Sequence, residues 1–193
     1  MNYADTEKIR YILHSGGWRE VTFNENPDLV ILNTCSVRQR AEDKVLGLSH
    51  VMRSLKLKNP QVQVVLTECM AQRLVRSGCN EHEDARYSRS LVRRLPWVDL
   101  VIPIGDRTGW EVMINESIVP ESAGDAQVLY DNCPQERSDR IRANVPISKG
   151  CNNFCTYCIV PFTRGREVSR SYTAIFNEVT DLVLRQYRLI TLL

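Results

Sequence analysis

The sequence predicts an α/β fold in which a parallel-sheet domain is followed by a second unit that runs strand, helix, strand. Short apolar runs of strand length alternate with longer segments whose apolar residues recur every three or four positions. Glycine or proline separates many of these segments, as is usual between helices and strands. Strands that alternate with helices in this way favour a parallel sheet covered by helices on both faces.

The first expected elements are a helix, a strand and a long second helix. Residues 5–14 form an amphipathic helix that ends at the Gly16-Gly17 pair, because glycine readily takes the left-handed conformation that closes helices. Residues 28–33 are an apolar run typical of a buried parallel strand. Ser36 and Gln39 match a capping box, which predicts the start of the next helix. The apolar face of that helix comprises Val37, Ala41, Val45, Leu48, Met52 and Leu55.

Two more strands complete the predicted sheet. The Asn59-Pro60 step ends the long helix, and residues 62–66 form the second strand. A helix over 71–77 follows, and residues 80–94 are polar and partly helical. Residues 98–104 form the third strand.

The apolar pattern breaks down after the third strand and returns later in the chain. The predicted division is an N-terminal domain at 1–106, a linker with one short strand at 107–140, and a second unit at 141–193. The second unit combines an extended segment at 145–148, a helix over 171–186 and an apolar strand over 189–193. A unit that ends on its second strand leaves an apolar edge uncovered.

The composition is that of an ordinary globular chain, since 43% of the 193 residues are hydrophobic and 25% are charged. It excludes a collagen-like, coiled-coil or disordered chain. The sequence contains no run of about 18 apolar residues, so no transmembrane helix is expected. The N-terminus lacks a signal-peptide pattern. We therefore expect a cytoplasmic protein with no membrane partner. In a reducing compartment, the seven cysteines serve more often as metal ligands or catalysts than in disulfides.

Basic side chains concentrate in one segment of the chain. Residues 137–170 contain seven basic and two acidic side chains, whereas the whole chain has a net charge of +2. A local basic excess favours an anionic partner. A solvated arginine-rich loop explains the same pattern, so charge alone leaves both interpretations open.

Three cysteines, Cys151, Cys155 and Cys158, lie within eight residues of one another. Three thiolates this close together suit a [4Fe–4S] cluster in which one iron lacks a protein ligand and is open to a small molecule. Structural zinc sites normally use four ligands in two separated pairs. A zinc knuckle completed by Cys133 or by a histidine, or three incidental thiols, are the alternatives.

Cys35 and Cys69 share a second pattern. Each follows a predicted strand and precedes a predicted helix, and ligands of open parallel sheets bind at this edge. Helix N-termini there also favour a thiolate or a negatively charged cluster. Buried, inert thiols explain the same positions equally well, because free cysteine is among the most buried residue types.

Three stretches of this sequence together resemble one enzyme family. Residues 147–170 resemble the radical S-adenosylmethionine signature of tRNA methylthiotransferases, and residues 33–45 resemble a motif of their N-terminal domain. Residues 68–73 match a third motif, with Glu68 where glycine is usual. The run Cys35-Ser-Val-Arg38 resembles the MiaB type of this family, the tRNA-2-methylthio-N6-dimethylallyladenosine synthases.

The resemblance implies a fold, two cofactors and a reaction. The second unit would be the first part of a radical S-adenosylmethionine (β/α) barrel. Cys151, Cys155 and Cys158 would hold a [4Fe–4S] cluster that cleaves S-adenosylmethionine to methionine and a 5′-deoxyadenosyl radical. Cys35 and Cys69 would bind a second [4Fe–4S] cluster. The product would carry a methylthio group on C2 of N6-isopentenyladenosine in the tRNA anticodon loop.

The resemblance also implies further site residues. Tyr157 would lie near the adenine of S-adenosylmethionine. Arg164, Arg166 and Arg170 are candidates for contacts to the cofactor carboxylate or to RNA phosphate, since arginine binds such anions through paired N–H groups. The sulfur donor and the reductant are not implied by these residues.

The sequence departs from the family at both ends. The family's first cluster cysteine would lie before Met1, which leaves two of three ligands for the second cluster, and residues 190–193 resemble the second barrel strand. We therefore expect a fragment that is inactive alone. The alternatives are related methylthiotransferases that act on threonylcarbamoyladenosine or on a ribosomal protein, and a zinc-stabilised RNA-binding module without catalysis.

Overall fold

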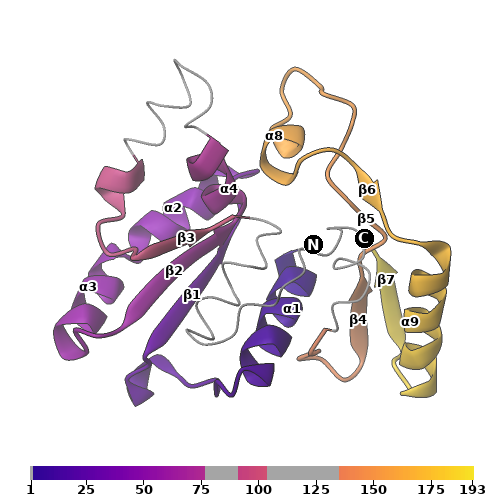
Figure 1. Ribbon diagram of the computed structural model, residues 1–193, viewed down its shortest axis with the longest axis horizontal. Helices are drawn as coiled ribbons and strands as arrows, with labels where there is room; N and C mark the ends of the chain where they lie inside the picture. Colours follow the sequence, from indigo (N-terminus) through magenta and orange to yellow (C-terminus); the bar gives the residue numbers. More distant parts are fainter. Residues whose placement is uncertain (1, 77–90, 104–134) are drawn as a thin grey trace, which may run out of the picture. The chain divides into compact units, whose positions relative to one another are not determined.

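The computed structural model describes residues 2–76, 91–103 and 135–193. The chain forms two compact units. We call the unit of residues 20–106 and 156–164 the sheet unit. The other, with residues 1–19, 107–155 and 165–193, is the β-α-β unit. Figure 1 labels the elements of both units along the chain.

The sheet unit is built on three parallel strands in the order β1-β2-β3. These strands are β1 (Leu29–Thr34), β2 (Gln63–Glu68) and β3 (Leu100–Ile102). The register pairs Thr34 with Glu68, so β1 and β2 end at the same edge of the sheet. Every residue of β2 after Gln63 is buried, as its apolar run predicts for a central parallel strand.

Helices follow the strands of the sheet unit in the predicted alternation. They are α2 (Gln39–Gly47), α3 (Ser49–Lys58), α4 (Cys69–Arg76) and the short α8 (Val160–Arg164), and a 3-10 turn η1 (Phe23–Glu25) precedes β1. Of the stretch predicted as partly helical, residues 91–94 are helical, and residues 80–90 lie outside the described part of the chain. The predicted linker falls largely in 104–134, which also lies outside it.

The sheet unit has a continuous apolar core. Its buried members come from β1, β2, the helices and the segment before β3: Val30, Val45, Met52, Leu55, Val62, Val64, Leu66, Met70, Leu91, Leu95 and Trp97. The indole N–H of Trp97 donates a hydrogen bond of 3.0 Å to the Ser49 hydroxyl. The ring is therefore buried without an unpaired donor.

The predicted helix that starts at Ser36 and runs through Leu55 is wrong in two respects. α2 begins at Gln39, whose side-chain amide donates to Asp43 at 3.1 Å, and the Ser36 hydroxyl is buried and has no hydrogen-bond partner in the described residues. Val37 consequently lies outside the helix and is about half exposed. The helix also breaks after Gly47, where the Ser49 hydroxyl donates to the Leu46 carbonyl at 2.8 Å.

The β-α-β unit has the predicted strand, helix, strand order, but its first strand ends at Val145, where the predicted extended segment of residues 145–148 begins. β4 (Arg142–Val145) pairs in parallel with β7 (Leu189–Leu192), and α9 (Tyr172–Leu184) connects them. The Ser171 hydroxyl caps α9 by accepting a hydrogen bond of 3.2 Å from the Ala174 N–H. A two-residue antiparallel ladder of β5 (Ser148–Lys149) and β6 (Val168–Ser169) was not predicted.

The N-terminal helix α1 (Asn2–Ser15) packs against β4 in this unit. Two hydrogen bonds of 3.0 Å end α1, from Gly17 to the His14 carbonyl and from Trp18 to the Leu13 carbonyl. Gly17 has a φ of 84°, so the predicted glycine stop is confirmed as a left-handed C-cap.

Four charged side chains come together in the β-α-β unit, three of them almost fully buried and the fourth, Glu178, 20% exposed. Arg170 donates to Glu178 of α9 at 2.6 Å, and Arg137 pairs with the other oxygen of the same carboxylate. Arg137 also lies 3.5 Å from Glu7 of α1 and donates to the Asn144 carbonyl at 3.0 Å. This ionic cluster therefore joins α1, β4 and α9.

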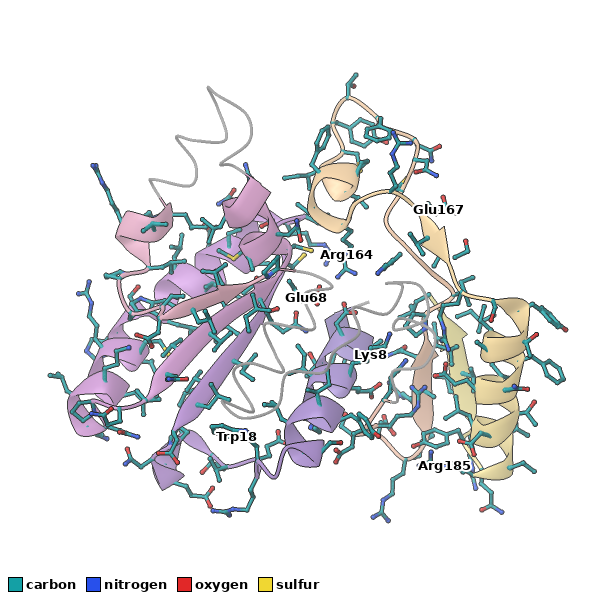
Figure 2. The ribbon with its side chains drawn as sticks, viewed as in Figure 1. Lys8, Trp18, Glu68, Arg164, Glu167 and Arg185 are labelled. Carbon is teal, nitrogen blue, oxygen red and sulfur yellow. The ribbon has the colours of Figure 1, made fainter. Side chains whose placement is uncertain are left out.

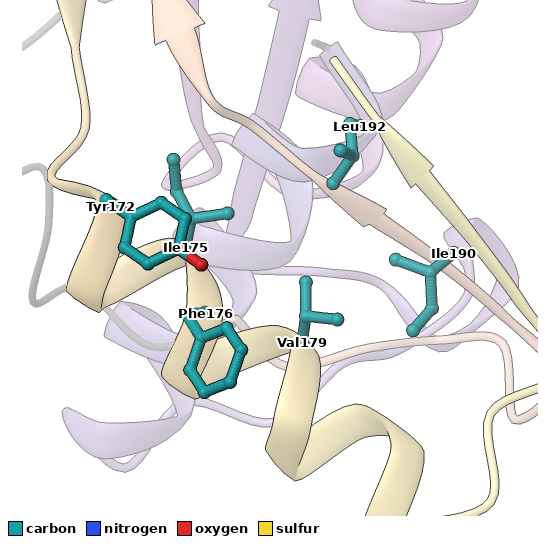
Figure 3. Close-up of a pocket in the computed structure, with 6 residues that line it drawn as sticks. All are labelled: Tyr172, Ile175, Phe176, Val179, Ile190 and Leu192. Carbon is teal, nitrogen blue, oxygen red and sulfur yellow. The ribbon is translucent and has the colours of Figure 1, made fainter.

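An apolar hollow lies on the exposed side of the same unit. Figure 3 shows its lining from α9 and β7: Tyr172, Ile175, Phe176, Val179, Ile190 and Leu192. Its volume is about 330 Å³. One small cluster of buried apolar side chains in this unit comprises Ala143, Val145 and Leu182, and Ala4 and Ile9 of α1 are also buried. Several large apolar side chains of α9 and β7 face solvent.

Candidate metal centre

Cys35 and Cys69 lie at one edge of the sheet, as predicted. Cys35 directly follows β1, and Cys69 is the first residue of α4, directly after β2. Since Thr34 pairs with Glu68, each cysteine comes one residue after the same rung of the ladder. Cys35 is partly exposed, whereas Cys69 has no exposed surface.

Two buried threonines fix the ends of the strands beside these cysteines. The Thr34 hydroxyl donates to the Thr67 carbonyl at 2.5 Å and accepts from the Met70 N–H at 3.3 Å. The Thr67 hydroxyl donates to the Ile102 carbonyl at 2.8 Å. These bonds tie β1, β2 and β3 together at the edge that carries Cys35 and Cys69. Sequence reasoning missed both threonines, although each stands at the end of a predicted apolar run.

Glu68 departs from ordinary backbone geometry. Its φ is 69°, in the left-handed region that favours glycine, which explains why glycine suits this place in the motif that residues 68–73 resemble. The Glu68 carboxylate lies 3.5 Å from the Arg164 guanidinium, and the two side chains are only 11% and 10% exposed. Figure 2 labels both side chains, Glu68 at the end of β2 and Arg164 at the end of α8.

Burial raises the pKa of the Cys69 thiol above its ordinary value. The positive charge of Arg164 and a hydrogen bond from the Ser36 backbone N–H act in the opposite direction, and the Glu68 carboxylate adds to the rise. The sulfur of Cys69 therefore lies within the field of both members of the Glu68–Arg164 pair.

The loop with the other three cysteines has a narrow base. The Cys151 N–H donates to the Gly165 carbonyl at 3.1 Å, and the Glu167 N–H donates to the Asn152 side chain at 3.1 Å. Gly150 has a φ of 78°, and a Cβ built there would lie 2.1 Å from the Arg166 carbonyl oxygen. The base closes because position 150 has no side chain.

The thiols of Cys151, Cys155 and Cys158 are partly exposed and form no disulfide. Cys151 and Cys155 belong to the β-α-β unit and Cys158 to the sheet unit. Among the residues that the structure describes, no three cysteine, histidine, aspartate or glutamate side chains are grouped so that they could hold a metal ion. Cys79 and Cys133, the latter the predicted fourth ligand of a zinc knuckle, lie outside those residues.

The other predicted site residues have different surroundings. Tyr157 is 89% exposed. The exposed Arg166 guanidinium stands over the Phe154 ring, 5.8 Å from its centre. Arg164 contacts Glu68, and Arg170 is buried against Glu178 and the Pro146 carbonyl.

Part of the basic excess in 137–170 is therefore internal. Arg137 and Arg170 belong to the buried ionic cluster, and Arg164 pairs with Glu68. Neither of the two interpretations open at the sequence level, an anionic partner or a solvated loop, accounts for these three arginines. None of the described helices combines the length and the apolar character that a membrane span requires.

Comparison with known proteins shows where the chain belongs. Residues 1–102 match the family described as "Uncharacterized protein family UPF0004". Proteins named tRNA-2-methylthio-N(6)-dimethylallyladenosine synthase from Clostridium botulinum (strain Okra / Type B1) and Desulforamulus reducens are each 36% identical to this chain over 198 residues. The synthase of the same name from Thermoanaerobacter sp. (strain X514) is 34% identical over 198 residues.

These alignments cover 100% of this chain and 42%, 41% and 40% of the respective relatives. The chain thus spans about two fifths of the length of the curated relatives it matches. The family match covers more than half of the chain, and the similarity to the synthases extends over all of it. The chain belongs to the UPF0004 family and is a relative of the tRNA-2-methylthio-N6-dimethylallyladenosine synthases.

Proposed function

We propose that this chain supplies the N-terminal part of a radical S-adenosylmethionine tRNA methylthiotransferase, with residues 141–193 as the first part of its barrel. The carrying observation is the Cys151, Cys155 and Cys158 motif in a chain that is similar over its whole length to the named synthases. The proposed reaction adds a methylthio group to C2 of N6-isopentenyladenosine beside the anticodon. The proposed partner is accordingly the tRNA anticodon loop, met in the cytoplasm.

The chemistry of the donors fits a [4Fe–4S] cluster at the three-cysteine loop. All three thiols are partly exposed and outside any disulfide, and soft thiolate ligands suit iron–sulfur clusters. Bound there, such a cluster would supply one-electron chemistry to S-adenosylmethionine through its open iron. Backbone hydrogen bonds at the base of the loop limit how far Cys151 moves from Gly165.

Other residues of the chain take supporting roles in this proposal. Cys35 and Cys69 supply two thiols for a second cluster at the edge of the sheet, where the threonine hydroxyl bonds hold the strand ends in register. Tyr157 presents an exposed ring one residue before Cys158, suited to stacking on an adenine. Arg166 presents an exposed guanidinium suited to a carboxylate or a phosphate.

Anaerobic reconstitution with iron and sulfide tests the metal. The wild-type chain should bind both and turn brown, and Cys155→Ala should lose most of that iron because two thiols do not hold the first cluster. Cys79→Ala, which removes a cysteine from neither motif, should bind as much iron as the wild type. A colourless chain that takes up zinc instead would support the zinc-stabilised RNA-binding module.

A chimera tests the substrate. In it, residues 1–193 replace the matching part of the Clostridium botulinum synthase, and the flanking parts of that relative are retained. Mass spectrometry should find methylthiolated isopentenyladenosine in tRNA, and the chimera with Cys155→Ala should form none. Modification of threonylcarbamoyladenosine or of a ribosomal protein instead would assign the chain to a related branch.

A further inference from the structure

Helix α8 brings a charged side chain from the three-cysteine segment to the second cysteine site. Arg164 is the last residue of α8, six residues after Cys158 in the sequence. Within the sheet unit, α8 packs against α4, the helix that begins with Cys69. The Arg164 guanidinium lies 3.5 Å from the Glu68 carboxylate, and its positive charge opposes the rise that burial gives to the Cys69 pKa.

We propose that Arg164 is a positioning residue that holds α8 over the Cys69 thiol, and that Glu68 holds the guanidinium in place. The meaning of this contact for a second cluster rests on the function proposed above. The contact itself is present in the structure.

The backbone conformation at position 68 does not explain why a glutamate is found there. A glutamate at a φ of 69° is less favourable than glycine in the same place, so stability of the backbone alone favours glycine. The carboxylate lies 3.5 Å from the Arg164 guanidinium at a nearly buried place, where solvent screens the two opposite charges less than at the surface. The residue with the unfavourable backbone conformation, Glu68, is thus the one whose side chain contacts Arg164 of α8.

Access to Cys69 follows from this arrangement. Cys69 has no exposed surface, and α8 packs on α4, the helix that Cys69 begins. In this proposal α8 covers the sulfur, so a reagent, an iron atom or a sulfur donor reaches Cys69 after α8 moves. That movement requires separation of Arg164 from both Glu68 and Cys69. The segment that follows the first cluster motif therefore controls entry to the second cysteine site.

Labelling of Cys69 by N-ethylmaleimide tests the proposal in the full metal-free chain, at one pH, with peptide mass spectrometry as the readout. Arg164→Gln should label Cys69 about ten-fold faster than the wild type, since local opening no longer separates the Arg164 guanidinium from the Glu68 carboxylate. Removal of a positive charge disfavours the reactive thiolate and slows labelling. A faster reaction therefore reports opening and not a change of the thiol itself.

Three variants separate positioning from general stability. Arg166→Gln, two residues further on and exposed, should leave the labelling of Cys69 unchanged. Arg164→Lys should keep part of the protection. Glu68→Gly removes the pair and relieves the left-handed backbone, and it should speed the labelling of Cys69. Loss of the carboxylate also lowers the pKa of the thiol, so this rate is interpreted together with that of Arg164→Gln, in which the charge effect has the opposite sign.

Two results would overturn the proposal. One is a rate for Arg164→Gln and Glu68→Gly that equals the wild-type rate. The other is a faster rate accompanied by equally faster hydrogen exchange at β2, which would mean unfolding of the whole sheet. Neither result depends on iron or tRNA, so a negative labelling experiment would not contradict the proposed function. Conversely, a failure of Cys151, Cys155 and Cys158 to bind iron would not contradict the role proposed for Arg164.

Discussion

The sheet unit and the β-α-β unit are both built on parallel strands, yet different interactions stabilise them. The three-stranded sheet buries a large apolar core that runs from Val30 to Trp97 along the chain. In the β-α-β unit, the apolar cluster around β4 and α9 has only Ala143, Val145 and Leu182 as buried members among the described residues, and the ionic cluster of Glu7, Arg137, Arg170 and Glu178 lies in the same unit. The difference follows from area, since two strands and one helix bury less apolar surface than three strands with helices.

The comparison also separates the two cysteine regions. Cys35 and Cys69 stand on regular strands whose ends are joined by threonine hydroxyls, so their positions follow from the sheet. Cys151 stands at the base of a loop whose closure depends on a glycine and on backbone hydrogen bonds. One region is fixed by core packing, and the other by local backbone contacts.

The largest effect is expected from the ionic cluster. Glu178→Ala leaves two buried guanidinium groups without their shared carboxylate, and loss of one partner of a buried pair costs about 3–5 kcal/mol. Denaturant unfolding followed by circular dichroism measures this loss, and hydrogen exchange should rise at β4 and β7 before β2. Asp181→Ala on the same helix removes an exposed pair with Arg185 and should cost less than about 0.5 kcal/mol. Equal effects of the two variants would contradict the contrast between the units.

A smaller effect is expected at the base of the three-cysteine loop. Gly150→Ala places a Cβ 2.1 Å from the Arg166 carbonyl oxygen at a φ of 78°, so the two backbone segments have to move apart. The expected loss in the free energy of unfolding is about 2–3 kcal/mol, together with weaker iron binding in reconstitution. Gly47→Ala is the matched control, because no atom lies within 4 Å of the added Cβ there. If Gly150→Ala were as stable as the wild type, the close approach of position 150 to the Arg166 carbonyl would not be required by the fold.

The smallest effect is a pH dependence confined to the β-α-β unit. Burial raises the pKa of Glu7 above its ordinary value of 4.5, against the opposing charge of Arg137. The folded chain therefore holds this proton to higher pH than the unfolded chain, and stability falls as pH rises through the raised pKa. Glu7→Gln should flatten this part of the curve of unfolding free energy against pH. If the wild type and Glu7→Gln gave the same curve, the protonation of Glu7 would not contribute to the pH dependence of stability.

Apolar runs and turn residues predicted most of the regular structure. Residues 28–33 and 62–66 became adjacent parallel strands, and this is why Cys35 and Cys69 were expected at one edge of a sheet. The helix stop at Gly17 was predictable because it depends on one residue's backbone preference. The roles of the five cysteines as metal ligands stay predictions.

Contacts between distant residues were not predictable from the sequence. Glu68 and Arg164 are 96 positions apart, and nothing in their immediate neighbours indicates that they meet. The two-residue strands β5 and β6 are too short to show any alternation. The capping box at Ser36 did not form: Arg38 is the N-cap of α2, and the Gln39 side chain bonds to Asp43 along its own helix.

The apolar hollow between α9 and β7 affects how these variants are assayed. Dyes that fluoresce in apolar surroundings bind exposed apolar surface, and this hollow of about 330 Å³ offers such surface in the folded chain. A dye-based melting curve would then start from a high signal and understate the transition. Circular dichroism, which reports the helices and strands directly, is the appropriate readout for every stability comparison of this protein.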